Sequence, residues 1–592
     1  MKILATISLM SLVTTAIFTS LCFTTPYSSG KLDRFKSFEE LKMFFETRRL
    51  ETWNPSQMTT LFLSEASSLR QMSGLTNEYA YSRTNIQVQG VDEADIVKND
   101  GEYLYIVAND KVFIVKAYPP EDAFVLSRIV VAGPVNQIFL SDERLVVFYE
   151  NRTRDMDTCV IRIYELSNKS DPIVKREMGV EGDYFSSRMI DDYVYAVVKK
   201  NAWCVENEDD LPKIFLDNEW KTPSATEIYY SDIVDYDYSF ATILSVNAKD
   251  DGKEPNYLTM VSGLTTFMYV STENIYLAIS YNGRTILHAI RISNGKISPT
   301  ANGRVSGTVL DQFSMDEFGG YFRIATTSQA TDLFETGRRM SLNENNVYIL
   351  NSNLVLVGKL EHLAPGETIH SARFMGNVCY LVTFRQIDPF FSIDLSDPYA
   401  PRVIGELKIT GYSDYLHPYD QNHVIGVGKD TVPAAEGDFS WHQGVKISLF
   451  DTTEMNEPKE IAKYVIGDRG SSSPVLNDHK AFLLDNEKDL LALPVTVTRI
   501  NKNQYPDLFP PYAYGDLVWQ GAYVFKISLD LPEKMSLRGT ITHVEDGNVL
   551  SESSHITRIL FIENILYTIS QTKVKLNSLP DLSEIKELSL SG

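Results

Sequence analysis

One pattern of apolar and polar residues recurs nine times between about Asp92 and Ile569. In each unit a short, partly apolar segment precedes a polar turn and then a run rich in Tyr, Val, Ile and Leu, such as GEYLYIV, DYVYAVV or NIYLAIS. Runs of this length and composition predict buried β-strands. Two further strands complete the unit, and the turn between them carries Asp or Asn before Pro, as in FFSIDLSDPYAP. Four short strands in every period are typical of a β-propeller.

The repeats therefore predict an all-β fold, a single closed β-propeller of nine four-stranded blades, or of eight if one unit is a distorted insertion. We expect the propeller to cover residues 82–592. Residues 31–81 are expected to form a helical segment and a connector. Ser37 can cap a helix that begins SFEELKMFF and has its apolar residues on one face. This helix is expected to pack on the ring or to space it from a membrane.

The N-terminal residues 1–30 have the pattern of an export signal. Lys2 supplies a positive charge, and Ile3 to Phe23 carries none. The uncharged stretch is also long enough to span a bilayer, which takes about 20 residues. Cleavage and retention as a membrane anchor both remain open. In either case the sequence predicts an extracellular or cell-surface protein, which contacts the membrane through this segment if it is uncleaved.

Charge and cysteine content narrow the choice of partners. The formal net charge is −23 and the pI about 4.9, so an acidic surface repels phosphate backbones and we expect no nucleic acid partner. Beyond Cys22, only Cys159, Cys204 and Cys379 are present, too few for a disulfide framework. Cys159 and Cys204 could pair, while Cys379 in NVCYLV is expected in the core.

Four long phrases resemble a known family: SRTNIQVQGVDEADIVKNDGEYLY (82–105), FFSIDLSDPYAPRVIGELKITGYSDYLHPYD (390–420), AFLLDNEKDLLALPV (481–495) and VWQGAYVF (518–525). They are similar to the secreted archaeal and bacterial β-propeller family that is distantly related to WD-repeat proteins. The resemblance covers nearly all of the chain after Tyr81. It implies an exported propeller of uncharacterised function, and it brings no catalytic residues to this chain.

A polar cluster precedes the first innermost strand. When the innermost strands are aligned by their apolar pairs, Asp95 falls in register with Gln137, Arg188, Arg373 and Arg558. Since innermost strands line the central channel, we expect carboxylates to pair there with guanidinium groups of other blades. The expected central-channel network is Asp92, Glu93, Asp95, Arg188, Arg373 and Arg558.

The same residues raise the question of a metal. Oxygen ligands suit calcium, so Asp92, Glu93 and Asp95 are candidate Ca²⁺ ligands, although no DxDxDG loop accompanies them. His417, in HPYDQNH, could contribute to a metal in the channel together with His370 and His555. Zinc needs three or four converging ligands, and the spacing does not indicate convergence. Hydrogen bonds in turns or packing account for these histidines as well, and no other cofactor is expected.

Two insertions interrupt the repeats, an acidic one at about 201–231 and an aromatic, Pro-rich one at about 500–516. Long loops on one face of a ring often carry binding sites. The expected binding-loop residues are Glu206, Glu208, Asp209, Asp210 and Trp220.

The sequence contains no GxSxG, HExxH, phosphate-binding glycine loop or CxxC motif, which favours binding over catalysis. The predicted function is a binding or scaffold module for an extracellular protein or glycan. The alternative is a hydrolase or lyase at the channel mouth, with the network residues as its site.

Overall fold

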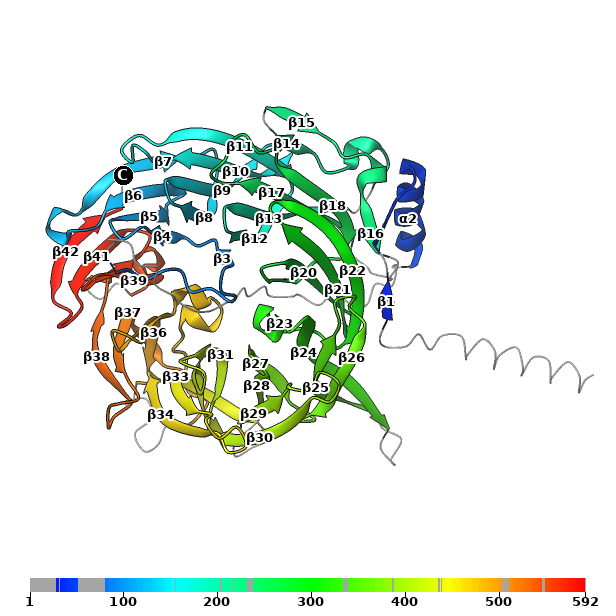
Figure 1. The fold of residues 1–592 in the computed structure, drawn as a ribbon. Helices are drawn as coiled ribbons and strands as arrows, with labels where there is room; N and C mark the ends of the chain where they lie inside the picture. Colours follow the sequence, from blue (N-terminus) through cyan, green and yellow to red (C-terminus); the bar gives the residue numbers. More distant parts are fainter. Residues whose placement is uncertain are drawn as a thin grey trace, which may run out of the picture.

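The computed structural model describes residues 28–30, 32–51, 80–154, 156–202, 205–216, 218–231, 238–333, 339–385, 388–434, 437, 439–501, 503, 510–545 and 549–590. Its strands form nine sheets arranged around a central axis (Figure 1). The predicted all-β propeller of four-stranded blades is confirmed. The export segment (1–27) and Cys204 lie outside the described residues. Among the residues described, no helix is long and apolar enough to cross a membrane.

Blades are numbered here in chain order, and in each the strands run antiparallel from the innermost to the outermost. Blades 1 to 3 contain β4 (Val97–Asn99), β5 (Tyr103–Ala108), β6 (Lys111–Lys116), β7 (Phe124–Val130); β8 (Val135–Ser141), β9 (Arg144–Arg152), β10 (Asp157–Glu165), β11 (Ile173–Glu181); β12 (Asp183–Ile190), β13 (Tyr193–Asn201), β17 (Ser239–Asn247), β18 (Asn256–Ser262). Blades 4 to 6 contain β19 (Phe267–Val270), β20 (Asn274–Tyr281), β21 (Arg284–Ser293), β22 (Lys296–Ser306); β23 (Met315–Phe318), β24 (Tyr321–Leu333), β25 (Arg339–Leu350), β26 (Leu356–Leu363); β27 (Thr368–Met375), β28 (Val378–Phe384), β29 (Asp388–Asp394), β30 (Arg402–Ile409). Blades 7 to 9 contain β31 (Tyr412–Pro418), β32 (His423–Pro433), β33 (Ser440–Asp451), β34 (Lys459–Ile466); β35 (Leu483–Asp485), β36 (Leu490–Arg499), β37 (Asp516–Ile527), β38 (Met535–Ile541); β39 (Arg558–Ile562), β40 (Ile565–Ile569), β41 (Lys573–Ser578), β42 (Glu584–Ser589).

Shorter elements extend these blades. Strand β3 (Asp92–Glu93) pairs with β12, and β14 (Ile214–Leu216) and β15 (Glu219–Lys221) widen blade 2 beyond β11. The 3₁₀ turns are η1 (Pro120–Asp122), η2 (Glu208–Asp210), η3 (Ala225–Glu227), η4 (Gln312–Ser314), η5 (Pro474–Leu476), η6 (His479–Ala481) and η8 (Glu552–Ser554).

Burial within a blade follows strand position. In blade 1, five of the six residues of β5 are buried, whereas in β7 only Ile129 is buried. The second strand is covered by both neighbouring blades, but the fourth faces solvent. This is why the continuous apolar runs in the sequence mark the second strands.

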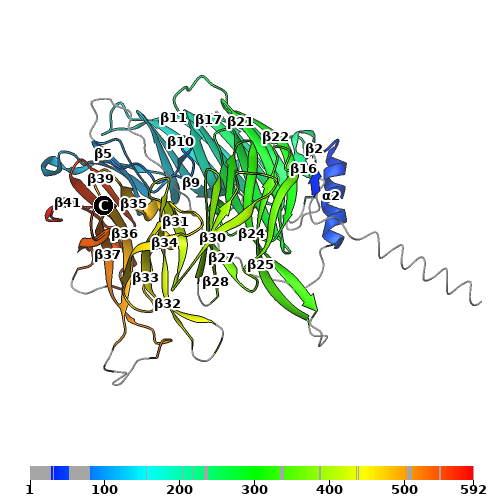
Figure 2. The same cartoon turned by 60° about the horizontal axis from the view of Figure 1, so that its bottom comes forward.

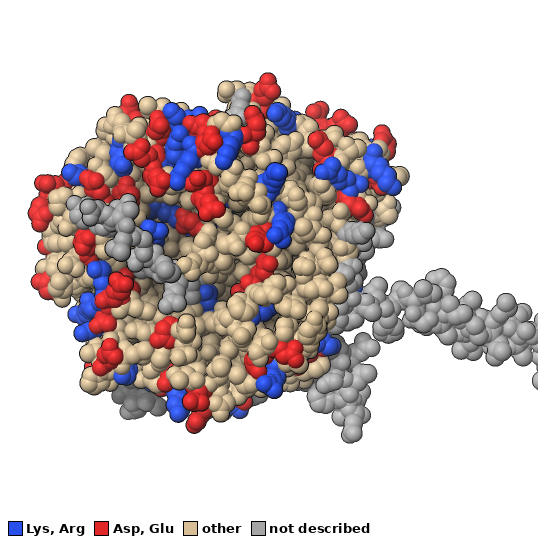
Figure 3. All heavy atoms as spheres, in the orientation of Figure 1, with Lys and Arg blue, Asp and Glu red and all other residues tan. Residues whose placement is uncertain are grey.

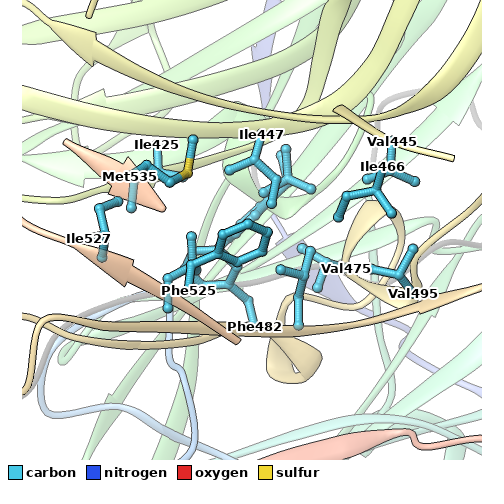
Figure 4. Close-up of a cluster of buried hydrophobic side chains, with 14 of the residues drawn as sticks. Ile425, Val445, Ile447, Ile466, Val475, Phe482, Val495, Phe525, Ile527 and Met535 are labelled. Carbon is cyan, nitrogen blue, oxygen red and sulfur yellow. The ribbon is translucent and has the colours of Figure 1, made fainter. Parts of the chain in front are cut away.

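The core lies between blades. Between blades 7 and 8, Ile425 and Ile447 pack against Phe482 and Phe525 (Figure 4). The same type of contact closes the ring, because residues of β5 and β6 form one buried cluster with residues of β39, β40 and β41. Closure therefore uses apolar packing between the first and last blades.

The two faces of the ring differ. Because neighbouring strands run in opposite directions, every turn between second and third strands lies on one face, here named the hairpin face. Figure 2 shows the long hairpins of blades 5, 7 and 8 extending on the same side. The opposite face, named the turn face, carries the remaining turns within blades, including the Asx-Pro turn at 395–401.

The described N-terminal residues lie against the outside of the ring. Strand β1 (Ser28–Gly30) pairs with β22, and β2 (Leu32–Arg34) pairs with β16 (Tyr229–Ser231), which runs parallel to β18. Helix α2 (Phe38–Glu51) buries Leu41 and Phe45 in a cluster with Leu211 and Ile228 of the acidic insertion. Part of this insertion thus serves as the docking surface for the N-terminal helix.

Candidate functional site

Residues 80–95, here named the channel segment, lie inside the ring (Figure 1). The segment starts at blade 9, where the Ser82 N–H donates to the carbonyl oxygen of Phe561 at 3.0 Å. The Phe561 N–H donates in return to the Ser82 hydroxyl at 2.9 Å. Farther along the chain, β3 adds to the innermost strand of blade 3. The segment therefore links distant blades before the first blade begins.

Two amide side chains of this segment hold it to blades across the channel. Nδ2 of Asn85 donates to the Tyr415 hydroxyl of blade 7 at 3.2 Å and to the carbonyl oxygen of His479 at 3.0 Å. Nε2 of Gln87 donates to the carbonyl oxygen of Gln312 at 2.8 Å, and the Gln312 amide donates back to Gln87 Oε1 at 3.1 Å. These hydrogen bonds fix the position of the channel segment, which has no periodic pattern of apolar residues.

The structure brings Asp95 and Arg558 together. Nε of Arg558 donates to Asp95 Oδ1 at 2.9 Å, and its Nη2 lies 2.6 Å from Oδ2 of Asp478. Burial on its own lowers the pKa of Arg558, but the carboxylates of Asp478 and Asp95 raise it above the ordinary arginine value. One guanidinium thus joins blade 9, the connection before blade 8 and the channel segment.

Glu93 and Arg188 form a second buried contact. Oε2 of Glu93 lies 3.5 Å from Nη2 of Arg188, which also donates to Oε1 of Gln312 at 3.1 Å. Oε1 of Glu93 accepts the Gln87 N–H at 2.9 Å. Burial lowers the pKa of the neighbouring His479 well below its usual range, so this imidazole is neutral and its Nε2–H donates to the Asn85 carbonyl at 3.0 Å.

Arg373 packs on an aromatic ring of the η4 turn. Its guanidinium carbon is 5.1 Å from the centroid of the Phe313 ring. Burial lowers the pKa of Arg373, and the nearby charges of Asp316 and Asp311 oppose that effect. Burial also raises the pKa of Asp311 to about 6, although this carboxylate accepts hydrogen bonds from the backbone and hydroxyl of Ser314. Among the residues of the predicted network, Asp95 contacts Arg558 and Glu93 contacts Arg188.

The alignment of innermost strands does not identify Asp478, His479 or Gln312, because all three lie in connections between blades. Gln312 opens η4, and Asp478 caps η6 by accepting the N–H of Lys480 at 3.2 Å. A capping Asp before a short segment is the one sequence signal that indicates such a turn. It does not indicate that the carboxylate also reaches Arg558.

The candidate metal ligands are engaged by other side chains. Asp92 Oδ1 lies 2.8 Å from Nζ of Lys98, and Nδ1 of His417 lies 2.9 Å from the Tyr415 hydroxyl while its ring packs on Phe482. Within the described ranges, no group of three or more His, Cys, Asp or Glu is placed to hold a metal. The residues that the sequence offered for a metal therefore do not form such a group: Asp92, Glu93, Asp95, His370, His417 and His555.

The acidic insertion forms ordered structure instead of an extended loop. Asn207 caps η2, and Oδ2 of Asp210 accepts the N–H groups of Glu206 at 2.9 Å and Asn207 at 3.0 Å. These hydrogen bonds hold the pKa of Asp210 below its usual range. Trp220 on β15 is 48% exposed. The five predicted binding-loop residues thus lie in the described part of one insertion: Glu206, Glu208, Asp209, Asp210 and Trp220.

A second exposed group of rings joins the hairpins of blades 7 and 8. The ring of Trp441 lies 4.9 Å from that of Phe439 and 5.8 Å from that of Tyr512. Arg469 lies between Trp441 and Tyr514, at 4.9 and 4.4 Å from the two centroids. Cation–π contacts and ring packing therefore hold these two hairpins to each other on the hairpin face.

Charged side chains are interspersed on the face of the ring turned to the viewer in Figure 3, where acidic and basic groups alternate. The net charge of −23 is therefore not gathered into one acidic patch on that face.

Comparisons with known proteins agree on the fold. A family model described as a β-propeller domain matches residues 81–582. An uncharacterized protein of Methanocaldococcus jannaschii is 30% identical over 579 residues, covering 84% of this chain and 82% of the relative. An uncharacterized protein of Archaeoglobus fulgidus is 29% identical over 510 residues, covering 73% of this chain and 78% of the relative.

Similarity to solved structures is weak. A protein from Lactobacillus plantarum aligns with a TM-score of 0.29 at 10% identity, covering 59% of this chain and 91% of that one. Pyrococcus horikoshii acylaminoacyl peptidase aligns with a TM-score of 0.26 at 11% identity, covering 67% of this chain and 55% of that one. Scores this low carry no argument about the activity of this chain.

Proposed function

Because the chain belongs to the β-propeller domain family, we propose that it is an exported binding scaffold for an extracellular protein or glycan. One observation carries the proposal: inside the ring the pairs Glu93–Arg188 and Asp95–Arg558 are buried, while long hairpins extend on one outer face. A ring whose interior carboxylates already contact arginines is suited to presenting ligands on its outer surface. The phrases SRTNIQVQGVDEADIVKNDGEYLY and FFSIDLSDPYAP further support a place in the secreted branch, distantly related to WD-repeat proteins.

The geometry favours this role over a hydrolase or lyase at the channel mouth. General acids, bases and nucleophiles must reach the reacting atoms of a substrate. Arg558 is instead shared between Asp95 and Asp478, and Arg188 lies against Glu93. Breaking such contacts to admit a substrate would leave buried charges without partners, which costs about 3–5 kcal/mol per pair.

Export rests on the uncharged stretch from Ile3 to Phe23 after Lys2. If the stretch is retained, the propeller is tethered to the membrane beside blades 3 and 4, where β1 and β2 lie. The intact mass of the native protein decides between cleavage and retention. A cytoplasmic protein of full mass in cell fractionation would contradict export.

The scaffold role is tested by comparing exposed aromatic residues on the two faces. Tyr514 is 69% exposed on the hairpin face, and Tyr399 is 65% exposed in an Asx-Pro turn of the turn face. The full-length wild-type protein, Tyr514→Ala and Tyr399→Ala are incubated with isolated cell envelopes of the source organism, and bound protein is measured after sedimentation. We expect Tyr514→Ala to bind several-fold less than the wild type and Tyr399→Ala to bind equally.

A reversed order of these two variants would place the contact on the turn face. Absence of envelope binding by the wild-type protein would contradict the scaffold role itself.

A further inference from the structure

A recess opens at the outer edge of blade 2, where the acidic insertion meets the end of β13. Its volume is about 690 Å³. Lys200, Asn201, Asp209, Lys213, Trp220 and Thr222 are among the residues that line it. A space of this size fits a ligand of several rings. The recess is therefore large enough for a short oligosaccharide or peptide.

The aromatic wall of the recess is held in place. The indole of Trp220 packs on the Phe215 ring, with centroids 5.3 Å apart and planes inclined at 47°. Phe215 and Trp220 are directly opposite each other on the paired strands β14 and β15. The indole nevertheless remains half exposed. A fixed, half-exposed indole offers a flat apolar surface at low entropic cost to a ligand.

Some polar groups of the recess are already bonded within the protein. Oε1 of Glu181 lies 2.7 Å from Nζ of Lys200, and Oε2 of Glu181 accepts the backbone N–H of Lys213 at 3.1 Å. Asp210 accepts the two backbone hydrogen bonds at η2. These groups shape the recess and leave little capacity for a ligand.

Other polar groups of the recess remain available. In the part of the chain that the structure describes, no hydrogen bond or ion pair engages the side chains of Asn201, Asp209, Lys213 or Thr222. Together they offer an ammonium donor, a carboxylate acceptor, an amide and a hydroxyl that can each donate or accept. The nearest charges are of both signs, so the recess favours neither a polyanion nor a polycation.

We propose that this recess is a glycan-binding site that takes a neutral oligosaccharide, with Trp220 stacked on one sugar ring. Sugars combine an apolar C–H face with hydroxyl groups that both donate and accept. This matches the indole and the four unengaged polar side chains. The inference rests on the proposed scaffold function and names the ligand class at one of its surfaces.

The first step of the test uses full-length protein on an array of neutral hexose and N-acetylhexosamine oligosaccharides. The dissociation constant of the strongest binder is then measured by calorimetry for the wild type, Trp220→Ala, Trp220→Phe and Trp441→Ala. We expect Trp220→Ala to weaken binding at least tenfold and Trp220→Phe to retain most of it. Trp441→Ala, which removes an indole from the other aromatic cluster, is expected to bind as the wild type. Near-UV circular dichroism confirms that each variant is folded.

Three results would overturn the glycan site. The array shows no neutral saccharide above background, Trp220→Ala binds as tightly as the wild type, or the exposed edge strand β15 captures extended peptides while saccharides do not compete. The scaffold proposal is judged separately by envelope binding. If the array and calorimetry show no saccharide binding while envelopes still bind the wild-type protein, the glycan site is wrong and the scaffold role stands.

Discussion

The channel segment and the recess beside β15 are both rich in charge, but the structure treats the two regions in opposite ways. In the channel, the side chains of Asp95 and Arg558 are nearly inaccessible to solvent and 2.8 Å apart. In the recess, Asp209 and Lys213 face solvent without engaging another described side chain. A charge buried away from water must be paired to offset its desolvation free energy. An exposed charge stays hydrated and needs no partner within the protein.

The difference teaches how to interpret the acidic composition of this chain. Paired charges inside the ring fix which blades face each other and contribute to architecture. Unpaired charges on the insertion contribute little to stability and are free to contact partners. Residue type alone does not separate the two roles. Burial and bonding do.

The largest effect is expected where a buried pair is broken. Arg558→Met leaves the Asp95 carboxylate buried without its guanidinium, so we expect the free energy of unfolding to fall by about 3–5 kcal/mol. Chemical denaturation measures the change. The matched control, Lys213→Met in the recess, should cost less than about 0.5 kcal/mol. If the two variants lost the same free energy of unfolding, the proposed difference between the channel and the recess would be wrong.

Histidine extends the comparison to pH. His288 on β21 is fully buried, neither ring nitrogen has a hydrogen-bond partner among the described residues, and burial lowers its pKa to about 4. The unfolded chain takes up a proton below about pH 6.5, but the folded chain does not until about pH 4. Its contribution to stability is therefore lost as the pH falls through this window, by about 3 kcal/mol in all.

We expect His288→Leu to remove this loss, so the difference between variant and wild type grows as the pH falls from 6.5 to 4. Thermal melting across this range provides the measurement. Parallel profiles for wild type and His288→Leu would show that His288 is protonated in the folded protein.

A smaller effect is expected for neutral amides. Asn85→Leu removes the hydrogen bonds to Tyr415 and to the carbonyl of His479, and we expect a loss of about 1–3 kcal/mol. Asn201→Leu, the same change in the recess, should alter stability by less than about 0.5 kcal/mol. Melting temperatures of the two variants measure the difference. An unchanged melting temperature for Asn85→Leu would mean that the channel segment is held mainly by its pairing with blades 9 and 3.

The fold was accessible from the sequence because each blade is a local antiparallel meander with its own apolar signature. Runs such as YLYIVA and VYAVV are apolar because they pack between neighbouring sheets, and this apolar composition is what identifies them in the sequence. The helix after Ser37 was likewise indicated by its cap, whose hydroxyl accepts the Glu40 N–H at 3.1 Å. Local patterns predict local structure.

The interior of the ring was less accessible, because its contacts join positions far apart in the chain. Alignment of the repeats predicts that carboxylates and arginines meet in the channel, but it does not say which pair forms: Glu93 contacts Arg188, and Asp95 contacts Arg558. Arg373 shares the register of the other arginines but packs on Phe313. Strands as short as β14 and β15 carry too few residues for a recognisable alternation, so the sequence indicated the recess only through Asp209, Asp210 and Trp220 of the acidic insertion.

The pairing of Ser82 with Phe561 has a consequence for biogenesis. The ribosome synthesises Ser82 before any blade and Phe561 only in the last blade. The channel segment therefore cannot form its hydrogen bonds to blade 9 until synthesis of that blade is complete. A truncated polypeptide lacking blade 9 has nowhere to seat its first strand and leaves the apolar side of β5 open to water. Only a chain that includes blade 9 buries the apolar surfaces of blade 1, so an incomplete chain remains exposed to proteases and to aggregation.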